Sequence, residues 1–359
     1  MKIDGLPSAL RDAPELTAAQ QRAGELSAMT TTLPKSRILG TGCYTPSRVV
    51  TNVDLEKIVD TSDAWIAERT GIRRRHIAAD NESSSDMAAA AGQRAIEAAG
   101  LTAADLDMII VGTVSGDTPM PACAVYVQQK LGATEIPAFD ISAACAGFVF
   151  SLTVADQFIA TGAARRILVI GVDLLSRCLN WSDRKTCVLF GDGAGAVILG
   201  PADTDGRGIL ANRIFTDGSL ADSLLIPGGG SAEPLTAEGM ERQRNKIHMS
   251  GSEVFKVAIK NLTSSSAMVV KAAGLTIDDV DWVVPHQANL RILTQVADRL
   301  GVPLERFVIN IAEYGNTSSA SIPIALDEAV RDGRIKPGNT VLFCGLGAGI
   351  SWGASLVRM

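Results

Sequence analysis

The amino-acid sequence predicts a duplicated α/β fold with five layers in the order α/β/α/β/α. The first observation behind this prediction is an internal repeat. Residues 98–102 (AAGLT) precede an apolar run at 108–110, and residues 272–276 (AAGLT) precede another at 282–284, 174 residues later. The second observation is that short, uninterrupted apolar runs alternate with helical stretches, as in strands that helices cover on both faces. Duplicating such a unit gives two sheets that share central helices.

Each copy of the repeat has the pattern of a helix end, a glycine stop, a short acidic turn and a buried strand. Further strands are predicted at the apolar runs 167–170, 196–199, 308–311 and 341–343. Helices are predicted at residues 85–99, 148–161, 250–273 and 289–300.

The turn-rich stretch near residues 200–210 suggests a boundary between two halves, residues 35–204 and residues 205–359. Residues 1–34 are an N-terminal extension that could form a short polar helix or stay mobile, and we expect it to have no catalytic role. Met29 within it is a candidate alternative start, because the patterned sequence opens only at Arg37.

Composition excludes several classes of protein. Hydrophobic residues make up 47% of the chain and charged residues 20%, which predicts a large buried core. The net charge of −6 disfavours a nucleic-acid-binding protein. The six cysteines form no Cys-x-x-Cys pair, which excludes a zinc ribbon, and their dispersal without a secretory signal predicts free thiols in the cytoplasm. The longest uncharged stretch, residues 337–357, holds five glycines, so we expect no membrane span.

Cys145 is the first candidate for catalysis. A strand expected at residues 138–141 leads into Ser-Ala-Ala-Cys-Ala-Gly and then an apolar helix, which places the thiol near a helix N-terminus among small residues. Backbone N–H groups and the helix dipole there favour the thiolate and can bind an oxyanion formed when sulfur attacks a thioester. The alternative is a buried structural cysteine, the interpretation that we give to Cys43, Cys123, Cys178, Cys187 and Cys344.

His286 and Asn316 are the next candidates. His286 directly follows a predicted strand, at the sheet edge where ligands bind, although a lone histidine is often only a buried polar group. Asn316 alone would be interpreted as a helix N-cap. The repeat relates all three residues, because the offset of 174 pairs Cys145 with Ser319 and His286 with Gly112. Two pseudo-symmetric halves would therefore bring Cys145, His286 and Asn316 together.

Two glycine-rich loops call for interpretation. Residues 191–195 (GDGAG) imitate a dinucleotide loop, but a strand follows them, so we expect tight packing. Residues 345–349 (GLGAG) follow a buried strand and allow the backbone to approach a ligand closely.

Six phrases of the sequence carry a family resemblance: residues 61–66 (TSDAWI), 69–73 (RTGIR), 143–148 (AACAGF), 190–195 (FGDGAG), 285–291 (PHQANLR) and 315–318 (GNTS). Through them, residues 38–359 resemble β-ketoacyl-acyl-carrier-protein synthase III, the thiolase-fold condensing enzyme that initiates bacterial fatty acid synthesis. The resemblance implies that Cys145 accepts an acyl group from acyl-CoA and that malonyl-acyl-carrier protein then condenses with it, losing CO2. His286 and Asn316 would stabilise the enolate, and the N–H groups of Cys145 and Ala348 would bind the oxyanion.

The same resemblance implies the substrate contacts and partners. No metal or cofactor is expected, because acyl-CoA and malonyl-acyl-carrier protein are substrates. The chain would form a homodimer, and no nucleic acid or membrane would be a partner. The implied residues are Trp65, Arg69, Arg184 and Asn289 for coenzyme A, Lys256, Gln287 and Arg291 for docking of the carrier protein, and Met120 and Leu346 for the acyl pocket, with Met120 serving the partner subunit.

Departures from the family pattern leave the primer open. Leu346 stands where an aromatic residue is common, Ala348 where glycine is common, and Ser142 where alanine is frequent. A ketosynthase or acyltransferase of specialised metabolism, making quinolones, pyrones or a polyketide starter, would keep the same three catalytic residues. A papain-like cysteine hydrolase shares the order Cys, His, Asn, but Asn316 lies too far from Cys145 in the sequence. A non-catalytic dimeric scaffold is the remaining alternative, which the intact triad disfavours.

Overall fold

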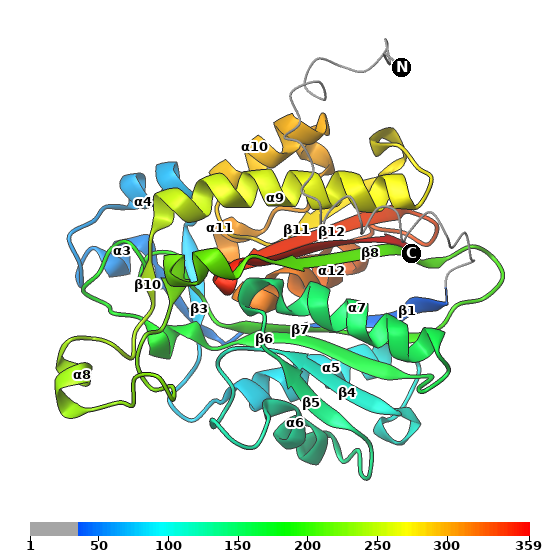
Figure 1. The fold of residues 1–359 in the computed structure, drawn as a ribbon, viewed down its shortest axis with the longest axis horizontal. Helices are drawn as coiled ribbons and strands as arrows, with labels where there is room; N and C mark the ends of the chain where they lie inside the picture. Colours follow the sequence, from blue (N-terminus) through cyan, green and yellow to red (C-terminus); the bar gives the residue numbers. More distant parts are fainter. Residues whose placement is uncertain (1–34) are drawn as a thin grey trace.

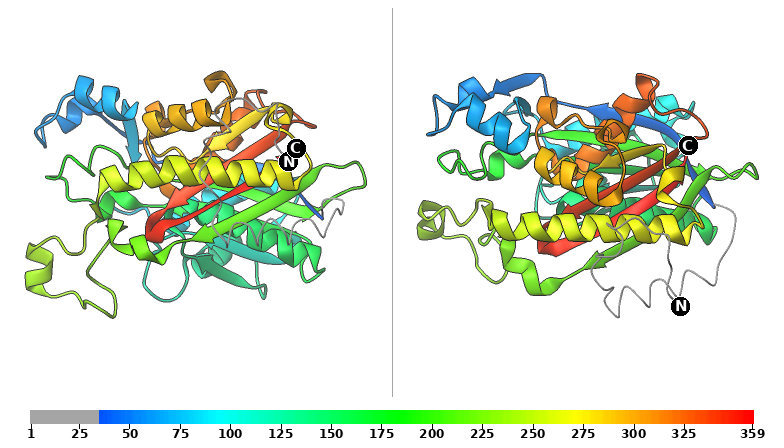
Figure 2. Two further views of the ribbon diagram at one scale, coloured as in Figure 1. Left: turned by 45° about the horizontal axis from the view of Figure 1, so that its top comes forward. Right: turned by 90° about the horizontal axis from the view of Figure 1, so that it is seen from above.

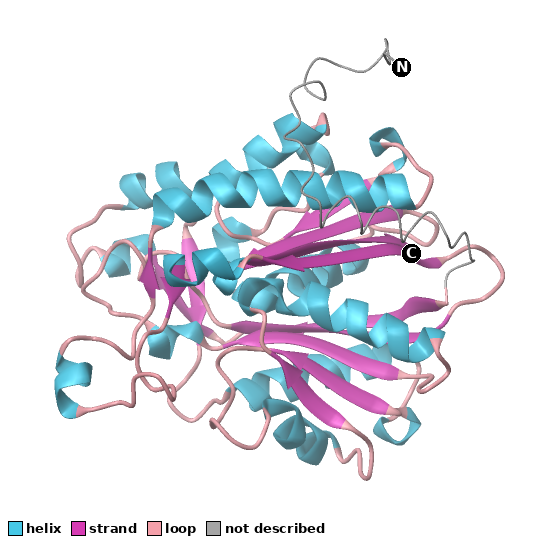
Figure 3. Ribbon diagram, in the orientation of Figure 1, coloured by secondary structure: helices cyan, strands magenta, loops and turns pink. Residues whose placement is uncertain are grey.

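A computed structural model of the chain describes residues 35–359, so the predicted N-terminal extension and Met29 lie outside the described residues. Helices and strands form five layers (Figures 1 and 3). In order, these are two helices, α5 (Ser84–Ala98) and α6 (Cys123–Leu131), then a first sheet, then α7 (Gly147–Ala160) and α12 (Ser321–Arg331), then a second sheet, and finally α9 (Gly251–Ala272) and α10 (Leu290–Leu300). The predicted five-layer α/β fold is confirmed.

The two sheets have matching strand orders. The first runs β1 (Ser36–Tyr44), β7 (Gly193–Pro201), β6 (Ile167–Asp173), β4 (Met108–Gly112), β5 (Ala138–Ile141). The second runs β8 (Gly208–Thr216), β13 (Ser351–Arg358), β12 (Thr340–Gly347), β11 (Trp282–Pro285). In both sheets the edge strand that comes first pairs antiparallel, and β4 and β11 pair parallel with β6 and β12. The proposed division at residue 204 falls between β7 and β8.

The repeat persists down to single hydrogen bonds. Gly100 and Gly274 both adopt left-handed backbone, with φ of 68° and 71°. The hydroxyls of Thr102 and Thr276 then donate to Asp105 and Asp279 at 2.8 Å each, forming capping boxes that start two equivalent 3-10 turns. The duplicated phrase in the sequence is therefore a duplicated structural unit.

The predicted helices are confirmed to within one residue at either end. They are α5 (Ser84–Ala98), α7 (Gly147–Ala160), α9 (Gly251–Ala272) and α10 (Leu290–Leu300), joined by α6 (Cys123–Leu131) and α12 (Ser321–Arg331). The further views show the long α9 lying along the strands of the second sheet (Figure 2). No helix within residues 35–359 combines the length and apolar character needed to cross a membrane.

The predicted strand at residues 308–311 is wrong. Only a single bridge forms there, between Phe307 and Val283, and the chain then turns into the short helix α11 (Ile311–Tyr314). Val308 and Ile311 are nevertheless buried. The apolar run reflects burial, and a short apolar run alone cannot distinguish a strand from other buried backbone.

Smaller elements project at one end of the layers. They are β2 (Arg48–Thr51), α3 (Asn52–Leu55), α4 (Asp63–Thr70), β3 (Arg74–Ile77), β9 (Leu224–Leu225), α8 (Ala237–Glu241) and β10 (His248–Met249). β2 pairs with β3, β9 pairs with β10, and α4 lies against α10.

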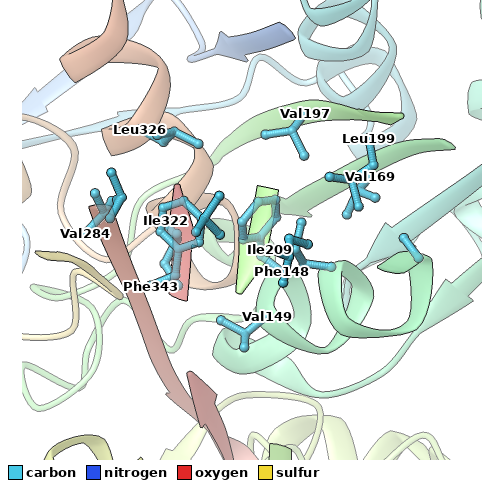
Figure 4. Close-up of a cluster of buried hydrophobic side chains, with 14 of the residues drawn as sticks. Phe148, Val149, Val169, Val197, Leu199, Ile209, Val284, Ile322, Leu326 and Phe343 are labelled. Atoms are coloured by element: carbon cyan, nitrogen blue, oxygen red, sulfur yellow. The ribbon is translucent and has the colours of Figure 1, made fainter. Parts of the chain in front are cut away.

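The central helices anchor the core between the sheets (Figure 4). Phe148 and Val149 of α7 and Ile322 of α12 are fully buried, and Phe148 meets Phe343 of β12 edge to face at 6.3 Å between ring centroids. Burying each such side chain stabilises the fold by about 1.5–3 kcal/mol. This packing fixes the N-terminal ends of both helices, where the residues discussed next lie.

Candidate active site

Cys145 lies in a single 3-10 turn, η2 (Ala144–Ala146), between β5 and α7. Ala144 adopts left-handed backbone with φ of 45°, and the Cys145 side chain is 6% exposed. Burial raises the pKa of the Cys145 thiol to about 12, the Ser318 hydroxyl opposes that rise, and the Asp173 carboxylate adds to it. Burial at this position therefore acts against the thiolate that the helix N-terminus was expected to favour.

The equivalent turn of the second half, η7 (Ser318–Ala320), faces Cys145. Ser318 occupies the repeat position of Ala144 and shares its left-handed backbone, with φ of 52°. Its hydroxyl donates to Cys145 Sγ at 3.3 Å, and its backbone N–H donates to Asn316 Oδ1 at 2.8 Å. Three residues further on, Ser321 Oγ lies 2.7 Å from His286 Nδ1. Residues 316–321 therefore bring Cys145, His286 and Asn316 to one place.

His286 directly follows β11 and is 2% exposed. Its backbone N–H donates to the Cys344 carbonyl at 2.8 Å, which continues the pairing of β11 with β12. Burial lowers the pKa of the imidazole to about 4, and a contact with the Ser318 carbonyl opposes that shift only in part. At neutral pH the ring is therefore uncharged and carries one N–H.

Asn316 is held by its backbone as well as by its side chain. Its N–H donates to the Leu189 carbonyl at 2.9 Å, and its carbonyl accepts from Gly191 at 3.0 Å. The glycine-rich loop at residues 191–195 thus positions Asn316. Because the N–H of Ser318 must meet the oxygen of the amide, the NH2 end of Asn316 is the end that can donate to a substrate.

The end of β12 passes directly over the nucleophile turn. A Cβ placed on Gly347 would lie 2.6 Å from the backbone N of Cys145 and 2.7 Å from the Ala143 carbonyl. No side chain fits between the two segments, so Ala348, the next residue, is brought beside Cys145. The GLGAG loop was expected to let the backbone approach a ligand, and the close approach seen here is to the backbone of the nucleophile turn.

Asp173, a buried carboxylate near the nucleophile, is a site residue that no sequence pattern indicated. It accepts hydrogen bonds from the hydroxyls of Thr113 (3.1 Å) and Ser115 (2.8 Å) and from the N–H groups of Val114 (2.9 Å) and Ser319 (3.3 Å). Burial raises its pKa, and the Ser318 hydroxyl, followed by the donors on Val114, Ser115 and Ser319, opposes that rise. In the repeat, Asp173 pairs with Gly347 and Ser319 pairs with Cys145. In the first half, the glycine Gly347 passes close to the turn that carries Cys145. At the equivalent place in the second half, the carboxylate of Asp173 contacts the turn that carries Ser319.

The residues expected at a coenzyme A mouth lie together on α4 and its neighbours. Two guanidinium groups lie over the ring of Trp65, that of Arg69 at 4.9 Å and that of Arg184 at 5.2 Å from the ring centroid. Arg184 also donates to the Asp60 carbonyl at 3.0 Å. Asn289 donates to the Arg69 carbonyl at 3.1 Å and caps α10 by accepting from Arg291 N–H at 2.9 Å.

Two of the three expected docking residues are exposed, and the third is not. Lys256 and Arg291 are exposed, and the Arg291 guanidinium lies 5.7 Å from the ring of Phe255, the neighbour of Lys256. Gln287 is only 1% exposed. Its amide donates to the carbonyls of Pro285 (2.9 Å) and Val308 (3.0 Å). The prediction that Gln287 contacts the carrier protein is wrong, and its side chain instead fixes the loop that carries His286.

The two residues expected in the acyl pocket, Met120 and Leu346, have opposite surroundings. Met120 is 84% exposed on the surface of the single chain. Leu346 is buried in the cluster between the second sheet and α9, because side chains alternate along β12 and its neighbours Gly345 and Gly347 face Cys145. The placement of Leu346 in the pocket is therefore wrong.

A smaller apolar cluster lies closer to the site: Leu175, Leu179, Phe190 and Ile247, with Leu224 at its margin. Phe190 forms a bridge with Asn316. The sequence signal was weak, since these residues come from four separate segments. Among residues 35–359 no group of three histidine, cysteine or acidic side chains could hold a metal ion.

Two family models match the segments that carry these residues. Residues 139–218 match the model described as 3-oxoacyl-[acyl-carrier-protein (ACP)] synthase III, and residues 270–359 match the model of its C-terminal part. The β-ketoacyl-[acyl-carrier-protein] synthase III of Methylococcus capsulatus is 52% identical over 323 residues, covering 90% of this chain and 98% of that protein.

Solved structures give the same picture. The 3-oxoacyl-[acyl-carrier-protein] synthase III of Aquifex aeolicus is 44% identical, with a TM-score of 0.83 over 90% of this chain and 100% of the other. The priming β-ketosynthase from the R1128 polyketide biosynthetic pathway is 37% identical, with a TM-score of 0.83 over 92% of this chain and 98% of the other.

Proposed function

The chain belongs to the 3-oxoacyl-[acyl-carrier-protein] synthase III family, the acyltransferases that carry out the initiating condensation of fatty acid synthesis, and we propose that it does so through a thioester on Cys145. The observation that supports the proposal most directly is that one segment, residues 316–321, brings the three candidate residues together. Through Ser318 and Ser321 it contacts Cys145 and His286, and it contains Asn316.

The first half-reaction loads the primer. The sulfur of Cys145 attacks the thioester carbonyl of acyl-CoA, a new S–C bond forms, and the bond to the coenzyme A sulfur breaks. Since burial keeps the Cys145 thiol protonated, its proton must leave with the coenzyme A thiolate to give free coenzyme A. Splitting the reaction through a covalent intermediate predicts ping-pong kinetics.

The second half-reaction makes the new carbon–carbon bond. Malonyl-acyl-carrier protein loses CO2, which leaves an enolate with negative charge on the thioester oxygen. His286 and Asn316 donate hydrogen bonds to that oxygen, and because both are neutral they stabilise the charge without protonating the carbon. The enolate carbon attacks the acyl carbon on Cys145. The released thiolate takes up a proton from the medium.

The oxyanion of each tetrahedral intermediate would be bound by the N–H groups of Cys145 and Ala348. This assignment is supported by the close passage of Gly347 over Cys145. Replacing Gly347 by alanine should force the two backbones apart. We expect about 1–3 kcal/mol of destabilisation, read from urea unfolding, and a drop of at least about 10-fold in the rate of acyl uptake by Cys145.

Gly230→Ala is the matched control for Gly347→Ala, because a Cβ on Gly230 meets no atom within 4 Å. A Gly347→Ala protein that unfolds at the wild-type urea concentration and takes up acyl groups at the wild-type rate would remove the support for this oxyanion site.

Substrates would enter at the mouth formed by Trp65, Arg69, Arg184 and Asn289. An adenine ring can stack on Trp65, and the two guanidinium groups can bind phosphates. Lys256 and Arg291 supply exposed positive charge beside the mouth, which suits an acidic carrier protein. The reaction needs no further cofactor in this scheme, and the cytoplasm is the expected compartment.

We place the primer against Leu175, Leu179, Phe190 and Ile247, with Met120 of a partner subunit closing the pocket. The exposure of Met120 supports this, because an apolar side chain that is 84% exposed in one chain is suited to insertion into another. A homodimer follows.

Met120→Trp should shorten the accepted primers by about two to four carbons, because a larger side chain fills the pocket. The chain-length preference is measured with straight-chain acyl-CoAs of increasing length. Met240→Trp, at another exposed methionine, is the control, and an unchanged chain-length preference in Met120→Trp would contradict the assignment.

Measuring the mass of the intact protein after incubation with a panel of acyl-CoAs tests the function as a whole. One acyl adduct on Cys145, discharged by malonyl-acyl-carrier protein with release of CO2, is the expected result. The second candidate is a priming ketosynthase of specialised metabolism, which the similarity to the R1128 enzyme favours. It would show the same adduct with a different preferred primer. A protein that releases the free acid without condensing would be a hydrolase, contrary to the proposal.

A further inference from the structure

Within residues 35–359, the hydroxyl of Ser321 is the one side chain that His286 contacts by a hydrogen bond. Nδ1 of the ring and Oγ of Ser321 are 2.7 Å apart, and both side chains are almost fully buried. Ser321 is the first residue of α12, so its place is fixed by the packed helix. The same oxygen lies 2.8 Å from the Ser318 carbonyl and accepts from the Gln287 N–H at 3.3 Å.

The single hydrogen of the Ser321 hydroxyl therefore has two acceptors within reach. If it points to the Ser318 carbonyl, Nδ1 must carry the ring hydrogen to make its bond to Oγ, and Nε2 is a bare lone pair. If it points to Nδ1, the ring hydrogen is on Nε2. Because the ring is uncharged, these two arrangements exclude each other.

The condensation needs the second arrangement. An enolate oxygen is stabilised by an N–H and repelled by a nitrogen lone pair. The donor must therefore be Nε2–H, since Nδ1 is already engaged by Ser321. We propose that Ser321 is a positioning residue that sets the tautomer of His286, donating its hydroxyl hydrogen to Nδ1 so that Nε2 carries the hydrogen that the enolate requires. This inference rests on the proposed function.

Ser321→Ala tests the proposal, because it removes the only side-chain donor that contacts Nδ1 among residues 35–359. Ser321 Oγ lies 2.7 Å from Nδ1 and 2.8 Å from the Ser318 carbonyl, so this carbonyl is on the Nδ1 side of the ring. Because a carbonyl can only accept, it should then favour the hydrogen on Nδ1. Malonyl decarboxylation and condensation should fall about 10- to 100-fold, with kcat affected more than KM. Acyl uptake by Cys145, followed by intact mass, should stay within about twofold. Ser321→Thr keeps the hydroxyl and should restore decarboxylation to within about threefold of wild type.

Ser265→Ala is the control for loss of a buried hydroxyl. Ser265 is also fully buried and donates to a carbonyl of its own helix, that of Asn261, at 2.8 Å, within α9. Equal losses of activity in Ser265→Ala and Ser321→Ala would mean that the effect is one of stability, and this would overturn the proposal.

Nitrogen-15 NMR of the imidazole reads the tautomer directly. The chain has only three histidines, so the spectrum is assigned with single substitutions at His76 and His248. The wild type should show the Nε2–H pattern for His286, and Ser321→Ala should show Nδ1–H. A wild-type Nδ1–H pattern, or one that Ser321→Ala leaves unchanged, overturns the proposal. If the wild type instead shows Nε2–H but takes up no acyl group, the proposed function has failed and the tautomer assignment stands.

Discussion

A His286→Ala protein should decarboxylate malonyl-acyl-carrier protein about 10²- to 10³-fold more slowly than wild type while still accepting an acyl group on Cys145. The imidazole is one of two neutral donors to the enolate, and removing a donor aimed at developing charge in a buried site has an effect of this size. Loading does not create an enolate, so it should continue.

The two steps are separated by measuring release of labelled CO2 and intact-protein mass on the same sample. Asn316→Ala should show the same separation, since its NH2 group faces the same oxygen in our scheme. If His286→Ala lost acyl uptake and condensed normally once loaded, His286 would be the base for Cys145 and the assigned roles would be reversed.

Cys145→Ala should form no acyl adduct, and its condensation rate should fall by about 10³-fold or more. Without the sulfur there is no covalent intermediate, and the enolate has no acyl group to attack. Cys43→Ala is the matched control, since Cys43 is a partly buried free thiol on β1. An adduct of unchanged mass on Cys145→Ala would place the acyl group elsewhere and end the proposal.

Much of the fold could be predicted from the sequence because the repeat is regular. The phrase Ala-Ala-Gly-Leu-Thr carries its own helix end and capping box, so finding it twice located two units and fixed the offset. The same offset related Cys145 to Ser319. Local signals of this kind depend on neighbours in the chain, which the sequence shows directly.

What could not be predicted depends on contacts between distant segments. Gln287 follows His286 in a motif of the family, yet its side-chain amide is buried. The amide donates a hydrogen bond to the Val308 carbonyl and accepts one from the Asn310 N–H, both more than 20 residues away in the sequence. Successive residues of β12 face opposite sides of the sheet, and Gly345 and Gly347 face Cys145. Leu346 therefore points away from the site, which the sequence alone could not show. Asp173 and Ser321 could not be identified as site residues from the sequence, because their contacts with Ser319 and His286 join segments that are far apart in the chain.

The carboxylate of Asp173 also has a consequence for stoichiometry. It accepts a hydrogen bond from the N–H of Ser319 at 3.3 Å. In the second half, the N–H equivalent to that of Cys145 is therefore already bound by the protein itself, and the equivalent side chain is a serine. The chain therefore has two structurally equivalent halves but only one residue, Cys145, that accepts an acyl group in our scheme. At saturation each chain should gain the mass of one primer, never two.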